Sequence, residues 1–174
     1  MENLLNWGIE VILWIQTLRP ALDTVFEAIT FLGEEMFYLL LLPFIYWCID
    51  RSIGASLAPL YLISAYINTL AKTMLFQPRP FQYDARVWVY DPEITRGGLP
   101  SGHTQQTVVV WGYLAAQFRR TWIAKATAVG KVAKATGLWA VAIVLMLLVP
   151  FSRMYLGVHF PHDLLGGYVL GGLC

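Results

Sequence analysis

Three separated segments of the sequence each carry a cation, a serine or a histidine, the side chains that phosphate chemistry needs. The residues of interest are, in chain order, Lys72 and Arg79, then Ser101, Gly102 and His103, then Arg153, His159 and Asp163. A phosphate ester requires cations for its oxygens, a nucleophile for its phosphorus and an acid for its leaving group. The three segments together supply each of these, so we predict that they form one site.

Lys72, Arg79 and Arg153 are the predicted phosphate-binding cations. Any one of them, alone at the end of an apolar run, would be typical of a side chain that reaches the lipid headgroups. Guanidinium groups pair well with phosphate oxygens, and three cations from separate segments favour an anion site. Pro78 and Pro80 flank Arg79 and restrict the backbone that aims its side chain.

The Pro-Ser-Gly-His run over 100–103 is predicted to open a helix. Ser101 is a suitable N-cap residue, and Gly102 allows a ligand to approach the backbone closely. The unpaired N–H groups of a helix start favour an anion. A plain helix cap would explain Ser101 and Gly102, but it would not explain His103.

His159 and Asp163 are four residues apart, which is one helical turn. Pro161 favours the first helical turn, which would place His159 just before the helix. The carboxylate would hold the proton of one ring nitrogen and leave the other nitrogen free to attack. His162 lies outside this spacing. Only three histidines are present and no acidic cluster accompanies them, so no metal site and no cofactor are expected.

The composition predicts an integral membrane protein. The chain is 57% hydrophobic and 13% charged, with a mean hydropathy of +0.57, whereas about 25% of the residues in a soluble domain are charged. We therefore expect residues 1–174 to form a single all-α domain, a polytopic membrane helical bundle. The net charge of +1 provides no basic surface for nucleic acid, and none is expected as a partner.

Apolar runs indicate about six transmembrane helices, with five as the alternative. The expected helical runs are 3–18, 21–32, 36–49, 53–76, 104–118, 135–151 and a short last helix from about 161 to 174. The runs 36–49 and 53–76 are separated by a short polar turn and should form an antiparallel hairpin. The last run is too short to cross ~30 Å at 1.5 Å per residue.

The two N-terminal runs are less apolar than the others. A polar stripe of Asn3, Asn6, Glu10 and Thr17 follows the run 3–18, which would either face the bundle or lie in the membrane interface. The run 21–32 is expected to form a short amphipathic helix at the membrane surface.

Counting crossings places all three segments on one side of the membrane, because an exit and the next return lie on the same face. The stretch 119–134 has five Lys or Arg residues and no acid, which is typical of a cytoplasmic connection. The site is therefore expected on the non-cytoplasmic face, which in a prokaryote is the outer face of the cell membrane. Membrane lipids are the expected surroundings.

Two further patterns concern partners. Gly166, Gly167, Gly171 and Gly172 place small residues at four-residue spacing in the last helix, which favours close helix packing and leaves a homodimer as an alternative. Aromatic residues flank Arg79 and the loop after it, where they could contact a lipid chain or serve as interfacial anchors. They are Phe76, Phe81, Trp88 and Tyr90.

The three segments resemble the signature of the type-2 phosphatidic acid phosphatase superfamily: K-x6-RP over 72–80, PSGH over 100–103 and SR-x5-H-x3-D over 152–163. Every defined position is matched. The stretch 32–50 more loosely resembles the sphingosine-1-phosphate-phosphatase-like branch.

The resemblance implies a metal-independent lipid-phosphate phosphatase. His159 would be the nucleophile that forms a phosphohistidine, and Asp163 would orient it. His103 would protonate the leaving group and then activate water. The residues that bind the phosphate would be Lys72, Arg79, Ser101, Gly102 and Arg153. The alternatives are a polyprenyl diphosphate phosphatase, an enzyme like the vanadium haloperoxidases, and a non-catalytic lipid-binding protein.

Overall fold

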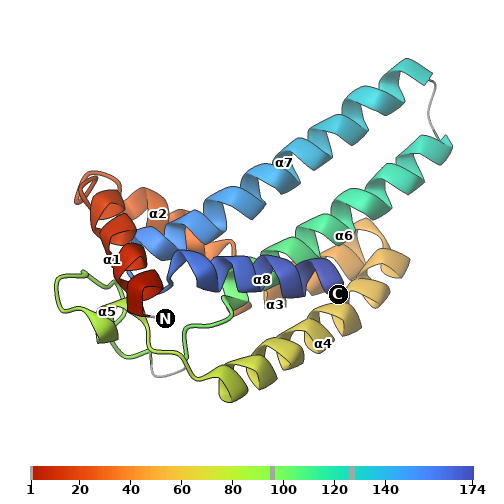
Figure 1. The fold of residues 1–174 in the computed structure, drawn as a ribbon. Coiled ribbons are helices and arrows are strands. Elements are labelled where there is room, and N and C mark those ends of the chain that lie inside the picture. Colours follow the sequence, from red (N-terminus) through yellow and green to blue (C-terminus); the bar gives the residue numbers. More distant parts are fainter. Residues whose placement is uncertain (1, 95–96, 126–127) are drawn as a thin grey trace.

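The computed structural model describes residues 2–94, 97–125 and 128–174, without the side chains of 121–135. Every regular element in this part of the chain is a helix (Figure 1), as predicted. The elements are α1 (Glu2–Gln16), α2 (Asp23–Phe31), α3 (Glu35–Phe44), the π-helix η1 (Ile45–Ile49), α4 (Arg51–Leu75), α5 (Pro80–Tyr83), α6 (Gly102–Lys125), α7 (Ala128–Tyr155) and α8 (Pro161–Leu173).

The expected hairpin is formed by α3 and η1 on one side and α4 on the other. Asp50 is the turn residue, and its carboxylate accepts hydrogen bonds from the N–H groups of Ser52 (2.8 Å) and Ile53 (3.0 Å). These bonds satisfy two of the unpaired donors at the start of α4. The wide last turn of η1 is closed by the Asp50 N–H, which donates to Ile45 O at 2.9 Å. A short polar turn therefore sends the chain straight back along itself.

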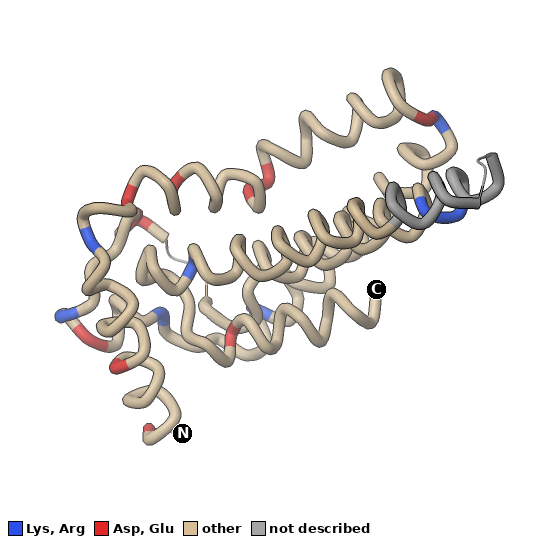
Figure 2. Tube along the Cα trace, turned by 90° about the horizontal axis from the view of Figure 1, so that it is seen from above, with Lys and Arg blue, Asp and Glu red and all other residues tan. Residues whose placement is uncertain are grey.

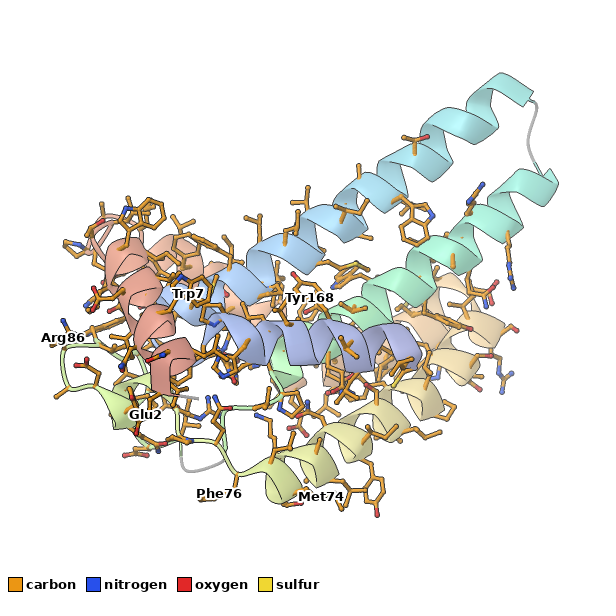
Figure 3. All side chains as sticks on the ribbon, viewed as in Figure 1. Glu2, Trp7, Met74, Phe76, Arg86 and Tyr168 are labelled. Atoms are coloured by element: carbon orange, nitrogen blue, oxygen red, sulfur yellow. The ribbon has the colours of Figure 1, made fainter. Side chains whose placement is uncertain are left out.

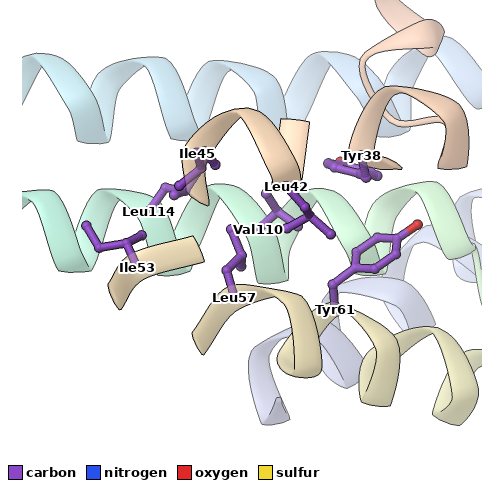
Figure 4. Close-up of a cluster of buried hydrophobic side chains, with 8 residues drawn as sticks. All are labelled: Tyr38, Leu42, Ile45, Ile53, Leu57, Tyr61, Val110 and Leu114. Atoms are coloured by element: carbon purple, nitrogen blue, oxygen red, sulfur yellow. The ribbon is translucent and has the colours of Figure 1, made fainter. Parts of the chain in front are cut away.

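A cluster of buried side chains joins this hairpin to α6 (Figure 4). Its members are Tyr38, Leu42, Ile45, Ile53, Leu57, Tyr61, Val110 and Leu114. Lipid tails are as apolar as these side chains, so close van der Waals packing holds such helices together in a bilayer. The cluster fixes α4 against α6, and thereby the relative positions of the first and second predicted site segments.

The last helix packs closely across α6 because of its glycines. A Cβ atom on Gly167 would lie 2.7 Å from Ser101 O, and one on Gly171 would lie 2.9 Å from Gln105 O. Any larger residue at either position would push the helices apart. The predicted close packing is therefore present within the chain. A Cβ on Gly172 would meet nothing within 4 Å, and the homodimer stays a prediction.

The polar stripe of α1 does not face the bundle. Leu5, Ile12 and Ile15 are buried on the opposite face of the helix. Asn6 accepts a hydrogen bond from Tyr83 Oη at 2.9 Å, and Glu10 pairs with Arg86 Nη2 at 3.1 Å. Of the two alternatives, the bundle-facing stripe is therefore excluded, because Asn6 and Glu10 find partners in the exposed segment around α5.

Two helices in the described residues are long and apolar enough to cross a membrane, Arg51–Tyr83 and Thr136–Tyr155. A third span arises if Asp23–Phe31 and Glu35–Ile49, bent by 48°, are taken together. Figure 2 shows the α3–η1 segment without charged residues between the acidic start of α3 and the turn before α4. The chain is thus an integral membrane protein, and the number of six spans stays a prediction.

The stretch 119–134 was expected as a connecting loop, and this is wrong for its backbone. Helix α6 continues to Lys125 and α7 begins at Ala128. Alanine, lysine and arginine have high helix propensity, so the helices continue beyond their apolar parts. The side chains of 121–135, and with them most of the basic residues of this stretch, lie outside the described residues.

Candidate active site

The site lies where four helix ends meet. Figure 1 shows the C-terminal ends of α4 and α7 and the N-terminal ends of α6 and α8 in the same half of the molecule, away from the C-terminal end of α6. Direct bonds join the segments: the Ser101 N–H donates to Asp163 O at 2.9 Å, and Arg79 Nη1 donates to Val158 O at 2.9 Å. The structure therefore brings the three predicted segments together across 91 residues of sequence, from Lys72 to Asp163.

His159 and Asp163 form a buried pair. Their Nδ1 and Oδ2 atoms are 3.3 Å apart, and the side chains are 2% and 0% exposed. The same carboxylate oxygen accepts the N–H of Phe160 at 2.8 Å, which fixes the carboxylate at the start of α8. Pro161 is the first residue of α8, as expected, and His159 lies just before the helix. Because Nδ1 faces the carboxylate, Nε2 is the nitrogen that remains for a ligand.

The second oxygen of Asp163 is held by residues that were not predicted for the site. Gln77 Nε2 donates to Asp163 Oδ1 at 3.2 Å, and His162 Nε2 lies 3.5 Å from the same oxygen. The Gln77 amide is also 2.5 Å from His162 Nε2. Gln77 lies between Lys72 and Arg79 in the first segment, and this position is the feature of the sequence that could have identified it as a site residue. His162, set aside on spacing, reaches Asp163 through its neighbouring position on α8.

The two arginines are buried and held by neutral oxygens. Arg79 is 4% exposed and Arg153 is 7% exposed. In addition to its bond to Val158, Arg79 reaches Gly97 O with Nη2 at 3.5 Å, and Arg153 Nη1 donates to Thr30 Oγ1 at 2.6 Å. These bonds orient the two guanidinium groups. Carboxylates at longer range balance part of their charge, Asp163 and Asp91 for Arg79 and Glu34 and Asp91 for Arg153. Arg153 Nε is buried and has no hydrogen-bond partner among the described residues.

Lys72 is half-buried at the end of α4, where its Nζ donates to Gly97 O at 3.0 Å. Lys72 and Arg79 therefore share Gly97 O as an acceptor, and their positive charges lie close together. Like charges at short range destabilise a site unless an anion joins them. The arrangement is consistent with an anion-binding site.

The start of α6 contributes Ser101, Gly102 and His103. Ser101 is buried, and its Oγ is 3.4 Å from the Thr104 N–H, so it serves as the helix cap that was predicted. A Cβ on Gly102 would lie 3.0 Å from Asn68 Oδ1 of α4. Close packing on α4 is therefore a second reason for glycine at this position.

His103 has a free ring nitrogen inside the protein. Its Nε2 is buried and lacks a hydrogen-bond partner among the described residues. Its ring lies behind Gly33, where an added Cβ would come within 3.1 Å of Cδ2. Buried polar atoms are usually paired, so this ring nitrogen is available to a ligand that enters the space beside it.

Two adjoining cavities share His103. The first, of about 520 Å³, is also lined by Arg153 and by residues of the α3 start and the loop around Asp91. The second, of about 450 Å³, is lined by Lys72, Gly102 and the outer face of α4. Glu35 and Leu39 belong to both linings. Four of the predicted site residues, Lys72, Gly102, His103 and Arg153, thus face space that a ligand can occupy.

Burial and, to a lesser degree, the surrounding cations control the protonation of His159. Burial lowers the pKa of His159 well below 6.5, and the cations of Lys72, Arg79 and Arg153 lower it further. A protonated imidazole would be both desolvated and repelled in this position. His159 is therefore neutral at pH 7, which is the form in which a ring nitrogen can act as a nucleophile.

The aromatic residues near the site divide into two groups. Phe76 is 77% exposed at the end of α4, where Figure 3 shows it pointing away from the bundle with Met74, and Tyr90 is also exposed. Phe81 instead packs on the buried cluster around α1, and Trp88 lies under Arg19, whose Cζ is 3.2 Å from the ring centroid. Both rings are only partly buried in this packing, so contact with a lipid chain and interfacial anchoring both stay predictions for these two residues.

The fold and the site together define a helical membrane protein with two buried arginines and a buried His–Asp pair where its helix ends meet. The PAP2 superfamily profile matches residues 53–174, and the chain belongs to this superfamily. Among curated proteins, it is 29% identical to glucose-6-phosphatase 3 of Bos taurus over 99% of this chain and 52% of the relative. It is 31% identical to sphingosine-1-phosphate phosphatase 2 of Mus musculus over 80% of this chain and 36% of that protein.

The fold matches that of a solved PAP2 protein. The transmembrane PAP2-type phosphatidylglycerolphosphate phosphatase of Bacillus subtilis superimposes with a TM-score of 0.78 over 95% of this chain and 79% of that chain, at 24% identity. The chain spans about half the length, or less, of the two curated relatives named above. The resemblance in motifs noted from the sequence is thus accompanied by a shared fold.

Proposed function

We propose that this chain is a membrane lipid-phosphate phosphatase that hydrolyses a phosphomonoester through a phosphohistidine, without a metal ion. The observation that carries the proposal is the buried His159–Asp163 pair, with Nδ1 and Oδ2 at 3.3 Å, beside two buried arginines. Pure binding of an anion needs the cations but not an oriented nucleophile. The names of the relatives, each a phosphatase, support the same reaction class.

In the first step, the lone pair of His159 Nε2 attacks phosphorus while the bond from phosphorus to the ester oxygen breaks. His103, protonated when the phosphate dianion is bound beside it, gives its proton to the departing oxygen, so the lipid leaves as a neutral alcohol. Asp163 retains the bond to Nδ1–H and stabilises the positive charge that the phosphorylated ring acquires. The step leaves a phosphohistidine and a neutral His103.

In the second step, a water oxygen attacks the same phosphorus and the bond from phosphorus to nitrogen breaks. His103 takes a proton from the attacking water, and the electron pair returns to His159 Nε2. Inorganic phosphate leaves, and both histidines regain their starting protonation states. Lys72, Arg79 and Arg153, with the Ser101 hydroxyl and the backbone N–H of Gly102, would stabilise the oxygens of the five-coordinate transition state.

The route of a lipid substrate is supported by the second cavity. Its outer lining includes Leu62 and Tyr66 of α4, which are 63% and 65% exposed, and its inner lining includes Lys72 and His103. An acyl or prenyl chain lying along the apolar side chains would place its phosphate among the cations. The basic stretch 119–134 favours a non-cytoplasmic site, because its five cations are typical of a cytoplasmic connection.

The proposal is tested by phosphate release from a panel of purified substrates: phosphatidate, phosphatidylglycerophosphate, sphingosine-1-phosphate and undecaprenyl diphosphate. We expect turnover of a lipid monophosphate by the wild type and none above background by His159→Ala. Turnover of the diphosphate alone would instead support the polyprenyl diphosphate alternative. Release from no member of the panel would overturn the proposal.

A chain-length series tests access from the bilayer. For one headgroup, kcat/KM should rise with each added CH₂ by up to about fourfold until the contact saturates, because a buried CH₂ contributes ~0.8 kcal/mol. Glycerol phosphate serves as the soluble comparison. A flat series, with glycerol phosphate hydrolysed as well as the lipid, would exclude this route.

A further inference from the structure

A buried glutamine lines the second cavity beside His103. This cavity, of about 450 Å³, is the one that Lys72 and His103 share with the outer face of α4. Gln106 of α6 belongs to its lining and is 7% exposed. The Oε1 atom of Gln106 is buried and has no hydrogen-bond partner among the described residues. The proposed reaction gives this side chain no task.

The preceding residue shows how an amide holds these helices together. Gln105 is fully buried, and its Nε2 donates to Ser64 O at 2.9 Å. Its Oε1 accepts a hydrogen bond from Asn68 Nδ2 at 2.8 Å. These bonds join α6 to α4 at the depth of Gln106. The connection between the two helices therefore does not depend on the Oε1 atom of Gln106.

The position of the unpaired oxygen distinguishes Gln106 from most other residues with unpaired atoms. Seven described side chains have a buried nitrogen or oxygen without a hydrogen-bond partner. Only His103, Gln106 and Arg153 among them line either of the two cavities at the site. The proposed reaction supplies partners for His103 and Arg153, which are the leaving oxygen and the phosphate. Gln106 is the member of this group that still lacks one.

Helical spacing relates Gln106 to the leaving oxygen. Gln106 follows His103 by three residues, so both lie on one face of α6, with Gln106 ~4.5 Å farther along the helix axis. A ligand atom beside Gln106 is then a few bonds from the oxygen that His103 protonates. The same cavity has an apolar part, formed by Leu39, Leu62 and Ala65. The amide thus lies between the phosphate site and the apolar lining.

An amide at this point opposes a plain hydrocarbon chain. When a lipid fills the cavity and displaces water, an amide oxygen that faces only CH₂ groups loses its hydrogen bonds to water and gains none. A hydroxyl group on the lipid restores one bond. Because a carboxamide offers both an acceptor and donors, a hydroxyl can pair with it in either orientation of the amide.

We infer that Gln106 is a specificity residue, which hydrogen-bonds a hydroxyl group two or three carbons from the ester oxygen of the lipid. This inference rests on the proposed function and adds a second polar contact to that of the phosphate. Lipid phosphates with such a hydroxyl are preferred over esters whose chain begins as plain hydrocarbon. Gln106 takes no part in the transfer of the phosphoryl group.

The test compares phosphate esters of one chain length, at equal mole fraction in the same detergent micelles. They are the 2-hydroxyalkyl, the 3-hydroxyalkyl, the 12-hydroxyalkyl and the unsubstituted alkyl phosphate. For the wild type we expect kcat/KM of the 2-hydroxy or the 3-hydroxy ester to exceed that of the unsubstituted ester by at least about fivefold. The 12-hydroxy ester should show no such gain, because its hydroxyl lies far from Gln106.

Variants Gln106→Leu and Gln106→Met remove the amide and keep a side chain of similar size. Each should abolish the preference for the 2-hydroxy or 3-hydroxy ester. The ratio of two esters is measured with one enzyme preparation, so a general loss of folded protein cancels. Gln117→Leu makes the same substitution on the same helix, outside the lining of both cavities, and should keep the wild-type ratio.

The outcomes separate the two proposals. Release of phosphate from none of the four esters would contradict the phosphatase proposal itself. Equal kcat/KM of the wild type for the unsubstituted ester and for both the 2-hydroxy and 3-hydroxy esters would overturn the role of Gln106 and leave the phosphatase proposal standing. A gain that is as large for the 12-hydroxy ester, or that persists in both Gln106 variants, would also overturn it.

Discussion

Replacing Asp163 by asparagine isolates the charge of the carboxylate from the presence of the nucleophile. One carboxylate oxygen faces His159 Nδ1 and the Phe160 N–H, and the other accepts from Gln77. If the NH₂ group of an asparagine took the place of the first oxygen, it would face two N–H donors, those of His159 and Phe160. If it took the place of the second oxygen, it would face only the amide of Gln77. The Gln77 amide can rotate to offer its oxygen. We therefore expect Asp163→Asn to keep a neutral bond to His159 and to lose the negative charge.

The size of the effect follows from the distance of 3.3 Å between Nδ1 and Oδ2. At an effective dielectric constant of about 20, two unit charges at this separation interact by ~5 kcal/mol. The retained neutral hydrogen bond and relaxation of the site reduce the loss to ~2–4 kcal/mol in the transition state. A loss of this size lowers kcat by about 30-fold to 10³-fold. His159→Ala removes the nucleophile and should cost on the order of 10⁴-fold or more.

The assay is single-turnover phosphate release by wild type, Asp163→Asn and His159→Ala, with acid-labile phosphoprotein trapped from a labelled substrate. We expect a trapped phosphoprotein in the wild type, slower formation in Asp163→Asn and none in His159→Ala. Thermal unfolding in detergent is the control that the variants are folded. Wild-type turnover by His159→Ala would refute the phosphohistidine mechanism, and equal losses in the two variants would refute the separate role given to the Asp163 charge.

Four further predictions follow from the geometry. Gln77→Ala should lower kcat about tenfold with little change in KM, because it removes the hydrogen bond to one oxygen of the Asp163 carboxylate. Gln77→Asn should not restore kcat, because its shorter side chain does not reach that oxygen, and an effect on KM alone would contradict a positioning role. The lowered pKa of His159 means that the unfolded chain binds a proton below about pH 6.5 that the folded site excludes, which lowers thermal stability, whereas burial raises the pKa of Asp163 to about 6, which acts in the opposite direction. Stability of Asp163→Asn should therefore fall more steeply than that of the wild type from pH 7.5 to 5.5, and equal slopes would argue against this pair of protonation states. Activity should survive EDTA and be inhibited by millimolar vanadate, whose five-coordinate form resembles the transition state; loss in EDTA that Mg²⁺ reverses would contradict this. In a background without the native cysteines, a cysteine at Gln82 should react with an impermeant thiol reagent in intact cells and one at Thr127 should not; the reverse pattern would invert the proposed orientation.

Local patterns were sufficient to predict much of this protein. The helical runs, the hairpin turn at Asp50 and the position of Pro161 at the start of α8 depend on residues close together in the sequence. Their hydrogen bonds and hydrophobicity act over one or two helical turns, so they can be inferred from spacing alone. The meeting of the three segments could also be predicted, because helix ends in a membrane alternate between its two faces.

Other features depend on contacts between distant segments. Gln77 meets Asp163 across 86 residues, and the acids of α3 share a cavity with Asp91 and His103. Phe81 and Trp88 look like lipid-facing aromatics in the sequence, and each also packs against other parts of the chain. Such roles depend on which surfaces the folded helices cover and on the angle at which they cross. Side-chain volume and close packing between helices determine both, and neither can be read from the spacing of residues along one segment.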